Sequence, residues 1–168
     1  MSIALRYAIP LLLIAPLLQQ TTNTTVEPSE YEVYSAVIRN LSLNPANGPL
    51  IIKDHTEVVG ATTIIDARKF PYGALDDFLK KNLYSTKLQK QFPIDERYYL
   101  ISEDEAYTRG YFVLGLSRVG FNSSKDRALV YVTYSMGGRN TKERYFALTR
   151  TGDQWVVQGT IGVLKMTQ

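Results

Sequence analysis

The chain has 168 residues, of which 45% are hydrophobic and 21% charged, a composition that indicates one globular domain and excludes disorder over most of the length. A formal net charge of +3 is too close to balance to indicate a nucleic-acid partner, and we expect none. There is no cysteine, which excludes disulfides and lipid attachment through a cysteine, so the core alone must hold the fold.

Residues 1–20 predict a signal peptide. A polar start containing Arg6 precedes an apolar run from Ala8 to Leu18 that includes two prolines. This run is too short to cross a bilayer and suits the apolar region of a secretory signal. A buried N-terminal helix and an uncleaved signal acting as a short anchor remain as alternatives. We therefore expect a secreted or periplasmic protein with no stable transmembrane span after signal removal.

Residues 21–28 are polar and rich in threonine, which predicts a linker, and residues 29–168 are expected to form a single domain. Ser29 and Glu32 have the spacing of a capping box, so the first helix should begin here and end before Asn44. Apolar side chains recur at intervals of three and four residues and predict one buried helix face. They are Tyr31, Tyr34, Val37, Ile38 and Leu41.

The middle of the chain alternates between strands and helices. Residues 50–59 predict a strand with charges in its middle, and residues 97–101 predict another. Between them, residues 74–83 predict a short amphipathic helix with acids in its first turn and lysines in its last, an order that suits the helix dipole. Its inward side chains are expected to be Leu75, Phe78, Leu79 and Leu83.

Four strands are predicted over residues 111–121, 127–136, 142–150 and 154–166. Apolar and polar residues alternate in them, and the short links require antiparallel neighbours. Glycines within the strands favour a curved sheet. The last strand should place four side chains on one face, namely Trp155, Val157, Ile161 and Val163. The predicted fold is α+β, with N-terminal amphipathic helices packed on a curved, mainly antiparallel sheet formed by this C-terminal four-strand meander.

We find no residue cluster that fixes a catalytic chemistry. His55 follows Asp54, but neighbouring side chains of a strand point to opposite faces, so Asp54 should not orient the histidine. Ser117 lacks the surrounding motif of a serine hydrolase, and Arg118 is expected to be solvated. With one histidine and no cysteine, we predict neither a metal site nor a cofactor.

Two sets of residues are candidates for ligand binding. Tyr131 and Tyr134 belong to an unusually large set of twelve tyrosines, and strand tyrosines often form amphipathic binding surfaces. Packing in the core is the alternative for them. Four lysines without an intervening acid could hold an anion, although a solvated helix face would also explain them. These are Lys80, Lys81, Lys87 and Lys90.

The last third of the chain contains the pattern SRVGFN, then ALVYV, then GxxWVV. This pattern resembles uncharacterised exported bacterial proteins, a group that has no assigned activity. The resemblance implies export and an α+β fold, and it implies no site residues.

The sequence therefore predicts an exported, non-catalytic binding module whose partner is a protein, a glycan or a small molecule. The alternative is an α+β cone of the nuclear-transport-factor-2-like kind. In that alternative a small-molecule pocket would include Asp54 and His55 and could support catalysis.

Overall fold

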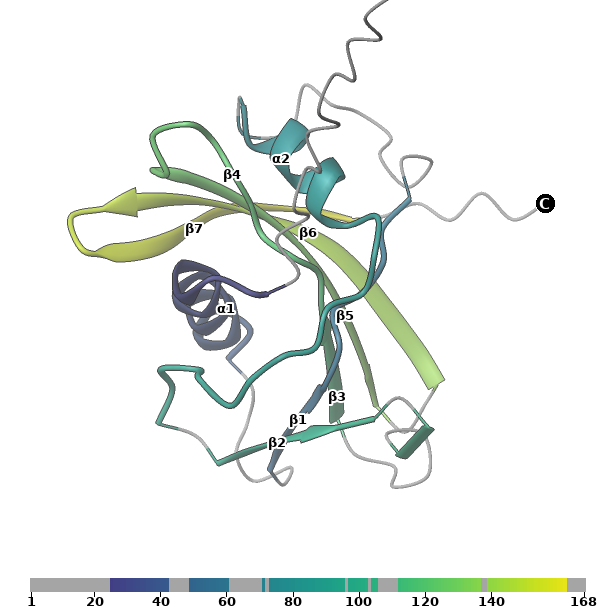
Figure 1. Cartoon of the computed structure of the whole chain (residues 1–168). Helices are drawn as coiled ribbons and strands as arrows, with labels where there is room; N and C mark the ends of the chain where they lie inside the picture. The colour runs from purple at the N-terminus through teal and green to yellow at the C-terminus, as the bar shows by residue number, and fades with distance from the viewer. Residues whose placement is uncertain are drawn as a thin grey trace, which may run out of the picture.

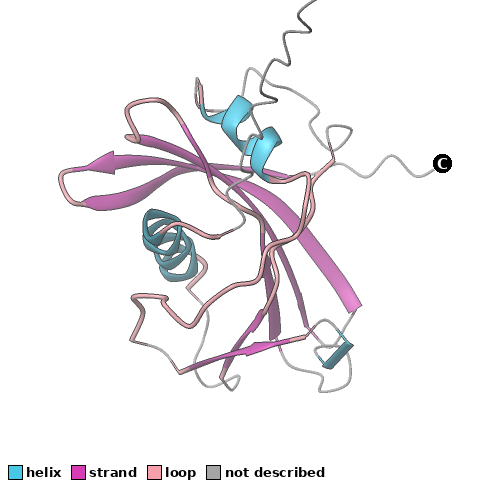
Figure 2. Cartoon of the chain, viewed as in Figure 1, coloured by secondary structure: helices cyan, strands magenta, loops and turns pink. Residues whose placement is uncertain are grey.

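The computed structural model describes residues 25–42, 49–60, 71, 73–95, 97–102, 104–105, 112–136 and 139–162. Figure 1 shows their arrangement, and Figure 2 colours it by secondary structure. The predicted α+β class with a mainly antiparallel sheet is confirmed. The elements are α1 (Pro28–Asn40), β1 (Leu50–Lys53), α2 (Ala74–Lys81), β2 (Tyr98–Ile101), β3 (Phe112–Leu116), β4 (Gly120–Phe121), β5 (Arg127–Met136), β6 (Arg139–Thr151) and β7 (Gln154–Gly162).

The seven strands form one open sheet in the order β2-β1-β3-β5-β6-β7, and β4 also pairs with β5. β1 is parallel to both of its neighbours, β2 and β3. The pairs β3–β5, β4–β5, β5–β6 and β6–β7 are antiparallel. β1 ends at Lys53, so the prediction of a strand through residue 59 was too long. Beyond it, His55 and Glu57 make only isolated bridges, to Lys87 and Ser117.

α1 lies on the inner side of the bent sheet (Figure 1). Tyr31, Tyr34 and Val37 of this helix belong to the same buried apolar cluster as Val130 of β5 and Phe146 of β6. Burying one large apolar side chain stabilises a fold by about 1.5–3 kcal/mol. The apolar face that the sequence predicts for the first helix is thus the one in contact with the sheet.

α2 lies on the opposite side of the sheet from α1 (Figure 1). Its Ala74 and Phe78 are fully buried in a second cluster with Leu129, Tyr131 and Tyr145. The central strands β5 and β6 are therefore covered on both faces. Among the residues that the structure describes, no helix has the length and apolar character needed to cross a membrane.

A glycine permits the close contact between α2 and the sheet. A Cβ atom on Gly120 of β4 would lie 2.4 Å from the carbonyl oxygen of Ala74 and 2.4 Å from Cβ of Phe78. No side chain fits in that space. The helix can approach β4 this closely because the strand has no side chain at this position.

A bulge in β7 changes which face its residues occupy. Val157 lies opposite Leu148 and Gly159 lies opposite Ala147, so Gln158 is an extra residue in the ladder. An extra residue moves the following side chains to the other face. Trp155 and Val157 accordingly pack on the α1 side, while Ile161 packs on the α2 side. The prediction that Ile161 shares their face was wrong, and Val163 lies outside the described residues.

The first helix begins at Pro28, with Glu27 at the N-cap. The prediction that Ser29 starts a capping box was wrong, because the Glu30 carboxylate accepts the backbone N–H of Glu27 at 3.1 Å. Proline suits the first helical position since it has no N–H to satisfy. Val26, within the predicted linker, packs against the cluster that contains α1.

Candidate functional site

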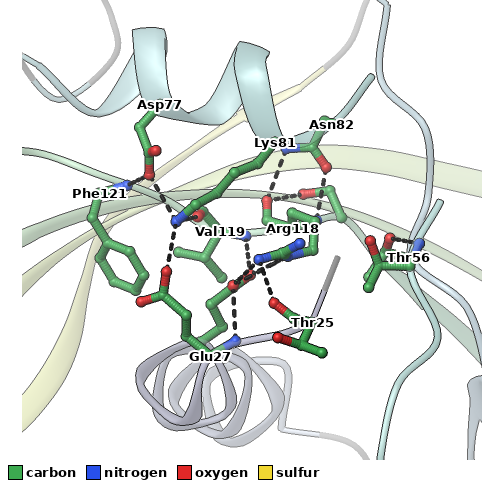
Figure 3. A network of polar contacts seen from close by, with 12 residues as sticks. Thr25, Glu27, Thr56, Asp77, Lys81, Asn82, Arg118, Val119 and Phe121 are labelled. Carbon is green, nitrogen blue, oxygen red and sulfur yellow. Dashed lines mark hydrogen bonds and ion pairs between the residues drawn. The ribbon is translucent and has the colours of Figure 1, made fainter. Parts of the chain in front are cut away.

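Three residues, Ser117, Arg118 and Val119, separate β3 from β4, where the sequence predicts one continuous strand. Arg118 is only 1% exposed, so the prediction of a solvated arginine was wrong. Its guanidinium binds the buried Glu30 carboxylate, with Nη2 2.7 Å from Oε1 and Nε 3.0 Å from Oε2. Nη2 also donates to the carbonyl of Thr25 at 2.9 Å (Figure 3).

The Glu30 carboxylate accepts further hydrogen bonds besides those from Arg118. The backbone N–H of Val119 donates to Oε2 at 2.8 Å, and the backbone N–H of Glu27 donates to Oε1. The Tyr34 hydroxyl lies 3.4 Å from Oε2 and donates to the Ser117 carbonyl at the shorter distance of 2.9 Å. A buried charge is tolerated when it is paired and its remaining hydrogen-bonding positions are filled, as they are here.

Side chains replace the missing ladder at the strand break. The Asn82 side chain accepts the backbone N–H of Arg118 at 2.7 Å and donates to the carbonyls of Arg118 and Phe78 at 3.0 and 2.8 Å. Oγ of Ser117 accepts the backbone N–H of Tyr131 at 2.9 Å. Every buried backbone group needs a partner, so these side chains make the break possible. We call Glu30, Tyr34, Asn82, Ser117 and Arg118 the polar clamp.

Arg118 stays charged and Tyr34 stays neutral at neutral pH. Burial disfavours the charge on Arg118, but the hydrogen bonds and the charge of Glu30 outweigh it and raise the pKa of Arg118. Burial, together with the nearby Glu30 carboxylate, raises the pKa of Tyr34 well above its ordinary value. Neither group can exchange a proton near pH 7, which argues for a structural role over acid–base catalysis.

Charged residues surround the polar clamp on the side of α2. The Lys81 ammonium lies 2.9 Å from Asp77 and 3.7 Å from Glu27, and the Asp77 carboxylate accepts the backbone N–H of Phe121 at 2.8 Å. Lys125 donates to Glu27 at 2.9 Å. That hydrogen bond lowers the pKa of Glu27, and the positive charge of Lys81 lowers it further against the opposing effect of burial. The N-terminus of α1 is thereby joined to α2 and to the turn before β5.

A second polar group occupies the α2 side of the sheet. The Tyr131 hydroxyl donates to Glu143 at 2.8 Å, and the Thr133 hydroxyl donates to Glu57 at 2.9 Å. Glu57 also pairs with Lys53 at 2.8 Å. Burial and the hydrogen bond to Glu143 raise the pKa of Tyr131. We call Lys53, Glu57, Tyr131, Thr133 and Glu143 the sheet-face group.

The two predicted tyrosines do not share a surface. Tyr131 belongs to the sheet-face group, whereas Tyr134 stacks on Phe112 with ring centroids 5.9 Å apart and packs against the cluster that contains α1. They are three positions apart along a strand, so their side chains point to opposite faces. Only Tyr131 therefore remains a candidate for the α2 side of the sheet.

The four predicted lysines have different surroundings. Lys81 is engaged by two carboxylates and by the Val119 carbonyl, and its ammonium lies 5.1 Å from the Phe121 ring centroid. Lys90 lies over the Tyr98 ring at 5.7 Å. Lys80 and Lys87 are exposed. Lys81 already has anionic partners within this chain.

Nδ1 of His55 lies 2.9 Å from Oδ1 of Asp54. The expectation that Asp54 could not orient the histidine was wrong, because both residues follow the end of β1 and are not bound by the alternation of a strand. The His55 side chain is 53% exposed. Within the described part of the chain, no group of three or more His, Cys, Asp or Glu residues is arranged to hold a metal ion.

Sequence reasoning missed Glu30, Asn82 and Arg118. Glu30 lies four residues before Tyr34 and seven before Val37, so an acid stood on the apolar face of the predicted helix. Arg118 likewise interrupted an apolar strand. An acid on the apolar face of the predicted helix and an arginine within an apolar strand were the available signal. Comparison of the chain with protein-family models, with curated proteins and with solved structures finds no match.

Proposed function

We propose that this chain is an exported, non-catalytic binding module of the periplasm or the cell exterior, and that the sheet-face group forms its ligand site. In this proposal the meander is a curved platform, the polar clamp keeps α1 and the segment after α2 fixed to it, and the fold changes little on binding. The apolar run from Ala8 to Leu18 and the resemblance to exported bacterial proteins support export.

The paired hydroxyl–carboxylate contacts of the sheet-face group support the proposal. Tyr131 with Glu143 and Thr133 with Glu57 lie on one face of adjacent strands, and Gly115 of β3 leaves the space that the Glu57 carboxylate fills. A Cβ on Gly115 would overlap this carboxylate and the Thr133 hydroxyl. The side chain of Glu57 is 21% exposed, so water and small solutes can reach it.

The chemistry of the site indicates the class of ligand. Carboxylates accept hydrogen bonds, hydroxyls both donate and accept, and a tyrosine ring adds an apolar surface. Sugars present the same combination of hydroxyl groups and C–H faces. A glycan is therefore the ligand class that the sheet-face group suits best.

The proposal predicts a ligand-induced rise in melting temperature. Neutral and amino sugars and their short oligomers would be screened against the purified chain, because a ligand that binds only the folded state stabilises it. Tyr131→Phe removes a hydroxyl and Gly115→Ala displaces Glu57, so each substitution should reduce the ligand-induced rise in melting temperature. Gly159→Ala is the matched control, since no atom lies within 4 Å of a Cβ there. A shift unchanged in Tyr131→Phe and Gly115→Ala would contradict the site.

A second candidate function is catalysis in a nuclear-transport-factor-2-like cone that closes a small-molecule pocket. One observation favours it, the 2.9 Å contact between His55 and Asp54, since a carboxylate that orients an imidazole is a common feature of general bases. Sugars incubated with the chain would be followed by proton NMR. The leading proposal expects no turnover, while turnover that His55→Ala abolishes would establish the second candidate instead.

A further inference from the structure

Three large apolar side chains are exposed on one part of the surface. Val58 is 57% exposed, Leu83 is 62% exposed and Tyr84 is 71% exposed. The prediction that Leu83 points inward was wrong, because α2 ends at Lys81 and leaves Leu83 outside the helix. A backbone hydrogen bond from Val59 to Asn82 brings Val58 close to Leu83 and Tyr84 along the chain. We call Val58, Leu83 and Tyr84 the apolar patch.

The backbone that carries the apolar patch is fixed. The Val59 N–H donates to the Asn82 carbonyl at 3.2 Å, and the Thr56 N–H donates to the Thr86 carbonyl at 2.8 Å. Oγ of Ser85 donates to the Thr56 carbonyl at 2.7 Å. The patch is therefore presented by two hydrogen-bonded segments. Adjacent apolar side chains held in water by an ordered backbone mark an interaction surface.

The N-terminal end of the described chain lies close to this surface. Asn82, the residue before Leu83, binds the backbone of Arg118, and the Arg118 guanidinium binds the carbonyl of Thr25 (Figure 3). The apolar run ends at Leu18, seven residues before Thr25. Seven residues reach at most about 25 Å when fully extended. A bilayer holding that run would keep the apolar patch within a short distance of its surface.

The residues around the apolar patch suit a lipid headgroup region. Lys80 and Lys87 are exposed on either side of Leu83 and Tyr84 in the sequence. Lysine can extend its ammonium toward phosphates while its methylenes cover apolar surface, and tyrosine is favoured where one end is apolar and the other is wet. The chain therefore places apolar side chains and cations together, as surfaces that bind bilayers do.

We propose that the apolar patch docks on the lipid bilayer that holds the apolar run of residues 8–18, which remains attached to the domain as an anchor. An 11-residue apolar run is too short to span the bilayer, so it would insert from one side only. This inference goes beyond the proposed glycan site and does not depend on it.

The absence of cysteine in the chain allows a site-specific test. The full chain carrying Tyr84→Cys, labelled with an environment-sensitive fluorophore, would be reconstituted in vesicles of phosphatidylcholine and phosphatidylglycerol. We expect a blue shift and strong quenching by lipids that carry a quencher on the acyl chain. Val156→Cys, at an exposed apolar position of β7, is the matched control and should show neither.

Two further measurements separate the apolar patch from the anchor. Adding Val58→Ser and Leu83→Ser to the labelled chain should abolish the quenching at position 84, although the anchor is unchanged. Mass spectrometry of the chain from native envelopes should find residues 1–20 retained. Equal signals at positions 84 and 156, quenching that survives the serine substitutions, or removal of residues 1–20 would each overturn the proposal. Protection of position 84 only in native envelopes would indicate a protein partner instead.

Discussion

Asn82 occupies a position where one side chain serves three backbone groups. It binds the N–H and carbonyl of Arg118 and the carbonyl of Phe78, all in a buried environment. An amide is the side chain that can both accept and donate in this arrangement. Leaving a buried polar group without a partner costs about 1–3 kcal/mol, so several lost bonds at one residue make a measurable effect.

We predict that Asn82→Ala lowers the free energy of unfolding by about 1–3 kcal/mol, because the buried Arg118 N–H loses its acceptor and the carbonyls of Arg118 and Phe78 each lose one of two donors. Urea denaturation followed by circular dichroism measures this. Asn40→Ala, an exposed asparagine at the end of α1, should change stability by less than about 0.5 kcal/mol. Equal effects of the two substitutions would contradict the role assigned to Asn82.

Glu27 should give stability a specific pH dependence. Its pKa is lowered in the folded state, mainly by the hydrogen bond from Lys125, so its ionised form stabilises the fold. Stability from such a carboxylate is present above its unfolded pKa of about 4.3 and is lost as the pH falls through the lower folded pKa. We predict that Glu27→Gln lowers the free energy of unfolding by about 0.5 kcal/mol at pH 7, since the Glu27–Lys125 pair is partly exposed. At pH 3 the substitution should not change the free energy of unfolding.

The measurement is thermal unfolding of wild type and Glu27→Gln from pH 7 to pH 3. High salt should reduce the difference at pH 7, because ions screen exposed pairs. Glu32→Gln, at an exposed position of the same helix, is the control. A difference between wild type and Glu27→Gln that grew as the pH fell would have the wrong sign and would rule out this account of Glu27.

At the scale of elements, the contact between α2 and β4 depends on Gly120. We predict that Gly120→Ala destabilises the domain by about 1–3 kcal/mol, because the new methyl group would meet the backbone of Ala74 and the Phe78 side chain. Gly159→Ala in β7 should be neutral or slightly stabilising, since the space around it is open. Urea unfolding of both variants provides the comparison, and a tolerated Gly120→Ala would show that α2 is not packed this tightly.

The strands and helices were predictable where periodicity is local. Alternation over residues 127–136 identified β5, and three- and four-residue spacing identified α1 and its buried face. The break between β3 and β4 was not predictable in this way, because its partners Glu30 and Asn82 lie 88 and 36 residues from Arg118 in the sequence. The bulge at Gln158 was missed for a related reason, since pairing with β6 determines it.

The candidate site was predictable only in part. Tyr131 was singled out for its residue type, whereas its partner Glu143 and the neighbouring Thr133–Glu57 pair became apparent only from the folded sheet. Tyr134 is also a tyrosine of β5, but it lies on the other face of the sheet, where it packs with Phe112. Residue type indicated a kind of surface, whereas the pairing of strands decided which residues share it.

At the scale of the whole molecule, the polar clamp joins parts of the chain that the sheet alone would not hold together. Glu30 comes from α1, Arg118 from the break between two strands, and Asn82 from the end of α2. These elements lie on both sides of the sheet (Figure 1). The two helices therefore have a common attachment point, which keeps the sheet-face group and the apolar patch in fixed positions.

A double-mutant cycle on Glu30 and Arg118 tests the central claim most directly. We predict that Glu30→Gln and Arg118→Met each lower the free energy of unfolding by about 3–5 kcal/mol, because each leaves a buried charge unpaired. The double variant should cost less than the sum, with a coupling energy of at least about 2 kcal/mol. Single variants within about 0.5 kcal/mol of wild type, or strictly additive losses, would contradict the polar clamp as the structural lock of this fold.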